Sequence, residues 1–140
     1  MIIVVDTNIF VGACLGQGAS AELVGQCLIG QHLALMGSAL LAEYEDVLSR
    51  EALFKRSRLD ADERSELLDI FLASCQWVRI YYTWRPNVPD EADNHLVELA
   101  VSGGASHLVT RNLKDLTRME LKFPDLAIIG PEGFLKEQRK

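Results

Sequence analysis

Short apolar segments alternate with stretches of helical periodicity along the chain, and this alternation most constrains its fold. The predicted strands are rich in β-branched or aromatic residues, as buried strands require, and they are Ile2–Val5, Leu33–Met36, Trp77–Tyr82, His107–Thr110 and Leu126–Ile129. Strands that alternate with helices pair in parallel through right-handed crossovers. The sequence therefore predicts an α/β fold, a three-layer α/β/α sandwich with a central parallel sheet of about five strands.

The segments between these strands carry apolar residues at the spacing of one helix face. The predicted helices are Ala19–Ile29, Ser38–Leu48, Asp62–Cys75, Pro89–Val101 and a short C-terminal helix from Pro131 through Leu135. Ser38 is predicted to cap its helix. No repeat or long linker divides the sequence, so one domain spanning residues 1–140 is expected.

Composition excludes several classes of protein. The apolar runs stop short of the ~20 residues that cross a bilayer, and no signal-peptide pattern opens the chain. We therefore expect a cytoplasmic protein without a membrane anchor. Cys14, Cys27 and Cys75 are odd in number, widely spaced and set among apolar residues, which predicts reduced core thiols and no disulfide framework.

The charge distribution limits how this chain could bind nucleic acid. A net charge of -6 argues against binding by bulk electrostatics. No Lys or Arg precedes Arg50, and a group of basic residues follows, comprising Arg50, Lys55, Arg56, Arg58 and Arg64. This group is either a local phosphate contact or a solvated helix end and loop, which is the commoner role of charge runs.

An aspartate ends the first predicted strand. Asp6 directly follows the apolar run Ile2–Val5. In open α/β sheets, ligands bind beyond the carboxyl ends of the strands. Aspartate after a strand is also a common turn or helix-capping residue. Asp6 alone does not distinguish a functional carboxylate from a cap.

Other acids follow the later strands. Glu43 lies in the first two turns of the helix after the second strand, Asp90 and Asp93 flank the start of the helix after the third, and Asp115 follows the fourth. Each could be a solvated carboxylate at a helix N-terminus. A parallel sheet would nevertheless gather them at one edge, and this convergence indicates a site.

Crowded carboxylates favour a metal ion. They repel one another and destabilise the fold unless a cation compensates. Oxygen ligands without His or Cys alongside select Mg²⁺ or Mn²⁺ over zinc, and His32, His95 and His107 are not spaced as metal ligands. Such ions activate water and neutralise phosphate charge. The acids therefore predict metal-dependent attack on a phosphodiester.

Four segments together resemble the PIN-domain ribonucleases, specifically the bacterial toxins of VapC-like toxin–antitoxin pairs. These are VVDTNIF, SALLAEYEDVL, PDEADNHLVELA and GGASHLVTRNLKDL, which occur in the family's order over nearly the whole chain. The resemblance implies a parallel sheet between helices and an acidic site that binds Mg²⁺ or Mn²⁺ and cleaves RNA. It also implies a cognate antitoxin as partner and a homodimer.

The resemblance assigns roles to single residues. Asp6, Glu43 and Asp93 match the family's catalytic acids and metal ligands. Asn112 stands where the family often has a fourth acid. Asp115 takes over that role, or a second ion binds weakly without RNA.

Neighbouring residues are expected to support this site. Asn8 and Thr110 are predicted to fix Asp6 and a metal-bound water, and Asp90 is an outer acid or a helix cap. The candidate phosphate contacts are Arg50, Lys55, Arg56, Arg58, Arg111 and Lys114. The predicted reaction is in-line attack on phosphorus by a water that the metal polarises.

Alternative functions remain open from the sequence. A haloacid-dehalogenase-type phosphatase needs a second aspartate where Asn8 stands, and a receiver domain needs paired acids after the first strand. An RNA- or protein-binding module with a weakened metal site is harder to exclude, because Asn112 already departs from the pattern.

Overall fold

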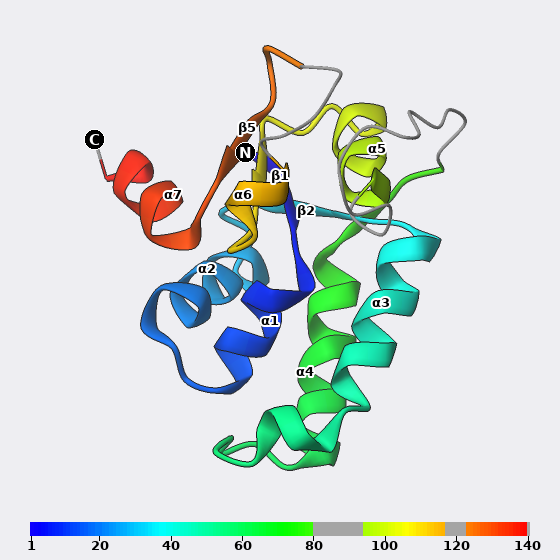
Figure 1. The fold of residues 1–140 in the computed structure, drawn as a ribbon, viewed down its shortest axis with the longest axis vertical. Helices are drawn as coiled ribbons and strands as arrows, with labels where there is room; N and C mark the ends of the chain where they lie inside the picture. The colour runs from blue at the N-terminus through cyan, green and yellow to red at the C-terminus, as the bar shows by residue number, and fades with distance from the viewer. Residues whose placement is uncertain (80–93, 117–122, 140) are drawn as a thin grey trace.

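A five-stranded parallel sheet forms the centre of the computed structural model, which describes residues 1–79, 94–116 and 123–139 (Figure 1). Its strands are β1 (Ile2–Val5), β2 (Leu33–Met36), β3 (Gln76–Trp77), β4 (His107–Val109) and β5 (Ala127–Ile129). They lie in the order β3-β2-β1-β4-β5, so β1 is central. Ile3 of β1 pairs with Ala34 on one side and with His107 on the other. This arrangement confirms the predicted α/β fold.

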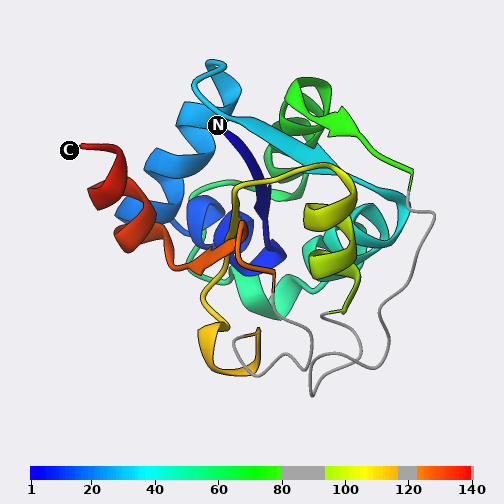
Figure 2. The ribbon, with the colours of Figure 1, turned by 90° about the horizontal axis from the view of Figure 1, so that it is seen from above.

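Helices cover both faces of the sheet. They are α1 (Thr7–Cys14), α2 (Gly18–Leu28), α3 (Ser38–Leu48), the 3₁₀ turn η1 (Glu51–Phe54), α4 (Ala61–Ser74), α5 (Asn94–Ser102), α6 (Leu113–Leu116) and α7 (Pro131–Gln138). Helix α5 contacts β1, β2 and β4 on one face, and α4 lies against β2 on the other (Figure 2). Helix α7 packs on α2. The result is the predicted three-layer sandwich.

Several element boundaries differ from the sequence-based expectation. Helix α3 is capped by Gly37 and not by Ser38, which is its first helical residue. Helix α4 begins before the predicted Asp62, because Asp60 and Glu63 form a capping box. Helices α1 and α6 and the η1 turn were not predicted, since each is too short to show a periodic apolar face. Parts of the predicted strand 77–82 and helix 89–101 lie outside the described residues.

Three buried aromatic rings pack between helices α1, α3 and α4. Phe10 of α1 lies 5.4 Å from Tyr44 of α3 and 5.5 Å from Phe71 of α4, measured between ring centroids. Tyr44 and Phe71 are 5.9 Å apart. All three side chains are fully buried. This aromatic cluster holds α1 against α3, the two helices that carry the residues around the first strand's end.

The three cysteines are free thiols; Cys14 and Cys27 are buried, and Cys75 is partly buried. Burial raises the pKa of Cys14 to about 11 and the pKa values of Cys27 and Cys75 to about 12. They therefore stay protonated near neutral pH. No helix in the described part of the chain is long and apolar enough to cross a membrane.

Candidate active site

The site lies where the strand order reverses. The chain proceeds from β1 outward to β2 and β3, then crosses back to β4 on the other side of β1. Such a switch point leaves a crevice beyond the carboxyl ends of the two neighbouring strands. Asp6 directly follows β1 and Thr110 directly follows β4. The Thr110 hydroxyl donates to Oδ2 of Asp6 at 2.7 Å and so spans this point.

Asp6 is both a helix cap and a buried carboxylate in this crevice. Its Oδ1 accepts a hydrogen bond from the backbone N–H of Thr7 at 2.7 Å, which caps α1. Its Oδ2 also accepts from the Asn8 amide at 3.3 Å. Only 4% of the residue is exposed. Asp6 is therefore a helix cap, and its carboxylate is also buried at the end of β1, because α1 begins immediately after the strand.

Glu43 reaches the same place from α3. The Thr7 hydroxyl oxygen lies 3.4 Å from Oδ1 of Asp6 and 3.2 Å from Oε1 of Glu43, so one hydroxyl contacts both carboxylates. The neighbouring Tyr44 hydroxyl donates to the carbonyl of Val5 at 2.7 Å. That bond ties α3 to the end of β1. The structure thus brings together Asp6 and Glu43, which lie in different elements, through the Thr7 hydroxyl.

His95 is a third member of the site, and sequence reasoning missed it. Its Nε2 lies 2.6 Å from Oε2 of Glu43. It sits in the first turn of α5, two positions after Asp93. This position, close to a predicted site acid, could have identified His95. It was set aside because the three histidines are not spaced as metal ligands. The premise that no imidazole lies beside the acids is therefore wrong.

The electrostatics of Asp6 suit a cation. Burial raises the pKa of its carboxyl above the usual value, and the nearby charge of Glu43 raises it further. Hydrogen bonds from Thr110 and Thr7 and the charge of His95 act in the opposite direction. A divalent ion would relieve both the burial and the repulsion. The carboxylate oxygens of Asp6 and Glu43 are the hard donors that Mg²⁺ or Mn²⁺ prefers.

The remaining predicted acids are not placed beside this pair. Asp90 and Asp93 lie outside the described residues, as does the side chain of Asp115, whose backbone belongs to α6. Within the described ranges, no group of three His, Cys, Asp or Glu side chains suits a metal ion. Asn112 adjoins the site through its backbone N–H, which donates to the Thr110 hydroxyl at 3.0 Å. The Asn8 amide lies 3.4 Å from the same hydroxyl.

Comparison with models of protein families shows which family this chain belongs to. The family model described as PIN domain matches residues 2–114 of the chain. The chain belongs to the PIN domain family. This confirms the family predicted from the four sequence segments. It also removes the phosphatase and receiver-domain alternatives, which belong to other families.

Solved structures share the fold of this PIN domain. One is a chain of VapBC2 from Rickettsia felis, crystallised with a DNA fragment from their promoter. It has a TM-score of 0.61 at 20% identity and covers 93% of this chain and 98% of that chain. Another is PAE2754 from Pyrobaculum aerophilum, with a TM-score of 0.60 at 19% identity, covering 99% and 90%. No curated protein matches the sequence.

Some candidate phosphate contacts of this PIN domain have partners within the protein. Arg111 pairs with Glu132 at 3.0 Å and donates to the buried Ser20 hydroxyl at 3.1 Å. Arg50 pairs with Asp46 at 2.5 Å. The Arg111 contacts hold the residues after β4 against α2 and α7. The pair of Arg50 and Asp46 stabilises the C-terminal end of α3.

Arg64 does not belong to an exposed basic group, contrary to the sequence-based expectation. It is only 3% exposed, and its guanidinium lies 4.2 Å from the centre of the Phe54 ring. It also donates to Glu51 and to the carbonyl of Leu59, at 2.7 and 2.9 Å. Arg64 therefore secures the chain between α3 and α4 from inside.

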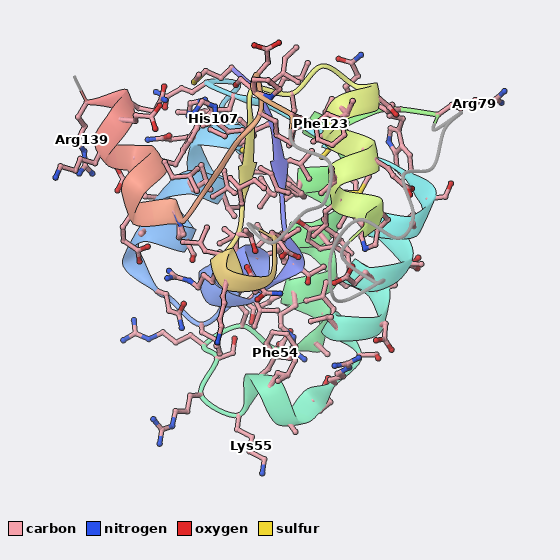
Figure 3. The ribbon with its side chains drawn as sticks, turned by 45° about the horizontal axis from the view of Figure 1, so that its top comes forward. Phe54, Lys55, Arg79, His107, Phe123 and Arg139 are labelled. Atoms are coloured by element: carbon pink, nitrogen blue, oxygen red, sulfur yellow. The ribbon has the colours of Figure 1, made fainter. Side chains whose placement is uncertain are left out.

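Three further members of the basic group are exposed, as Arg50 is. Lys55, Arg56 and Arg58, here called the basic loop, lie between η1 and α4 at one end of the molecule. Lys55 points away from the protein (Figure 3). Arg56 and Arg58 line a hollow of about 380 Å³ together with the C-terminal end of α1. Ser57 fastens the loop there by donating to the carbonyl of Cys14 at 3.0 Å.

Proposed function

We propose that this PIN domain is a divalent-metal-dependent endoribonuclease that acts as the toxin of a toxin–antitoxin pair. The observation that carries the proposal is the buried Asp6 beside Glu43, at the switch point of the sheet. Membership of the PIN family and the resemblance to VapC-like toxins support the choice of RNA as substrate. The VapBC2 neighbour, named as a complex, supports a small antitoxin partner.

The residues of the chain divide the work of this reaction. Asp6, Glu43 and Asp93 would hold Mg²⁺ or Mn²⁺, which when bound activates a water and neutralises charge on the phosphate. Hydrogen bonds from the Thr110 hydroxyl and the Thr7 backbone N–H fix the orientation of the Asp6 carboxylate. Glu43 is half-buried and completes the ligand set or orients the water.

The direct test measures RNA cleavage. The purified protein is incubated with a panel of labelled RNAs, with Mn²⁺ and with EDTA, beside the Asp6→Asn variant. We expect cleavage only by the wild type with metal. Binding of RNA or of a partner without cleavage, and without stabilisation by either metal, would instead favour the binding module with a weakened site.

Growth arrest tests the toxin assignment. Expression of the chain alone in a bacterial host should stop growth, because an uninhibited ribonuclease depletes RNA. The Asp93→Asn protein should be harmless at equal expression, since it lacks a metal ligand. Growth curves with immunoblots measure this, and Arg139→Ala, which alters the exposed residue directly after α7, serves as a control that stays toxic. Equal harmlessness of wild type and Asp93→Asn would contradict the toxin role even if RNA cleavage were real.

The basic loop should contribute to RNA binding. The eight residues of α1 span about 12 Å, so Arg56 and Arg58 lie one helix length from Asp6 and could contact a phosphate beyond the cleaved one. Replacing both with alanine should weaken RNA binding several-fold. The slope of log affinity against log salt should fall by about 0.7 for each lost contact.

This measurement uses Asp6→Asn protein in EDTA, so that RNA stays intact, with and without the two arginine substitutions. Arg139→Ala in the same background is the matched control, because it removes an exposed arginine elsewhere. If the two arginines only neutralise the carbonyl end of α1, their loss would lower the melting temperature and leave the salt slope unchanged.

A further inference from the structure

His95 makes one short contact that no assigned role of the site explains. Its Nε2 lies 2.6 Å from Oε2 of Glu43, and 9% of its side chain is exposed. Its Nδ1 is buried and meets no hydrogen-bond partner among the described residues. The bond to Glu43 is therefore the polar contact that holds this ring in place.

The direction of the bond follows from the chemistry of the two groups. An ionised carboxylate only accepts hydrogen bonds, so Nε2 of His95 is the donor. The other oxygen of Glu43 lies 3.2 Å from the Thr7 hydroxyl. Glu43 thus has a donor at each oxygen, one from α1 and one from α5. Two such anchors restrict the rotation of a side chain that is otherwise about one-third exposed.

The positions of these two donors affect how Glu43 can bind a metal ion. A carboxylate keeps further lone pairs after accepting one hydrogen bond at each oxygen, and the two donors select which lone pairs face the crevice beside Asp6. Outer-shell donors of this kind typically change metal affinity by 10–100-fold when removed. A free Glu43 would have to lose its rotational freedom on binding the ion.

We propose that His95 is a positioning residue for metal binding, acting through Glu43 and not as a metal ligand itself. This inference rests on the proposed function, because it assumes that Glu43 binds the ion. Direct ligation through Nε2 would require breaking the 2.6 Å contact, and Nδ1 is buried away from solvent. His95 therefore completes the site from α5 without entering the ligand set.

Two amide substitutions test whether a donor at position 95 must reach Glu43. Gln and Asn carry the same N–H donor, but at different distances from the backbone. In His95→Gln the side-chain N–H extends far enough to replace Nε2, whereas in His95→Asn it is one methylene shorter. Calorimetric Mn²⁺ titration should give near wild-type affinity for the Gln variant and at least about 10-fold weaker affinity for the Asn variant. With RNA, the Mn²⁺ concentration for half-maximal cleavage should rise in the Asn variant, while the rate at saturating Mn²⁺ should stay close to that of the wild type.

His107→Gln is the matched control. His107, labelled in Figure 3, is also buried and also contacts a glutamate, Glu137 at 3.2 Å. It starts β4, whereas Thr110 follows the other end of the strand. Its substitution should leave Mn²⁺ affinity unchanged. Circular dichroism in EDTA checks that all variants fold, and His95→Ala replaces the Asn variant if that variant does not.

The outcomes separate this inference from the proposed function. Equal Mn²⁺ affinity in the wild type and the Asn variant would overturn the positioning role. Equal loss in the Gln and Asn variants would also overturn it, because it would show that the imidazole itself binds the metal. Mn²⁺ binding that follows the predicted order without cleavage of any RNA would overturn the ribonuclease proposal alone. A wild type that binds no Mn²⁺ would overturn both.

Discussion

The Asp6→Asn variant is expected to cleave RNA about 1000-fold more slowly than the wild type, which corresponds to about 4 kcal/mol of lost transition-state stabilisation. The substitution removes one carboxylate charge from the pair that would hold the ion. Its Oδ1 can still accept from the Thr7 N–H and cap α1. The variant should therefore fold, and it should lose the rise in melting temperature that Mn²⁺ gives the wild type by binding only the native state.

Stability of the metal-free protein gives a second readout of the same substitution. The folded-state pKa of Asp6 is raised above its usual value of 3.8. Between these two pKa values the native state holds a proton that the unfolded chain has lost. The free energy of unfolding in EDTA should therefore fall as the pH rises through this window. Asp6→Asn should remove this part of the pH dependence and be at least as stable as the wild type near neutral pH.

Asp69→Asn is the control for these measurements, because Asp69 is an exposed residue of α4 and its loss changes the net charge equally. It should cleave RNA like the wild type and keep the response to Mn²⁺. Wild-type cleavage by Asp6→Asn would contradict the proposed site. So would a stability profile in EDTA that both variants share with the wild type.

The Phe10→Ala variant should lose about 4 kcal/mol of unfolding free energy, within the range for buried aromatic truncations. Phe10 is fully buried and its ring contacts both Tyr44 and Phe71. Its removal leaves a cavity between α1, α3 and α4, and it also removes the aromatic contacts between these helices. Urea denaturation in EDTA, followed by circular dichroism, measures the change.

The comparison for this prediction is Ile29→Ala. Ile29 is 74% exposed at the end of α2, so its truncation should cost less than about 0.5 kcal/mol. If Phe10→Ala lost less than about 1 kcal/mol, the aromatic cluster would not be what holds α1 against α3, and the alignment of Thr7 between the two acids would need another explanation.

The sequence by itself determined the layered fold and one edge of the site. Apolar runs of strand length alternate with helical periodicity, and this local pattern is sufficient for parallel strands flanked by helices. Parallel order then places Asp6 and the helix carrying Glu43 at the same edge, because all carboxyl ends of the strands lie there. Thr110 was named only through the family resemblance, and its contact with Asp6 depends on the position of β4 beside β1, which the structure shows.

Only the tertiary structure decided which residues of the same type are buried and which of them contact the candidate site. Arg64 belongs to the same basic stretch as Arg56 and Arg58, yet it is buried against Phe54 while they remain exposed. His95 contacts Glu43 across 52 positions of sequence, whereas His107 contacts Glu137 far from the site. Periodicity records which face of an element is apolar, but not which distant element covers it. Such contacts are fixed by the packing of α1, α3 and α5 around the end of β1, and they exist only once the chain has folded.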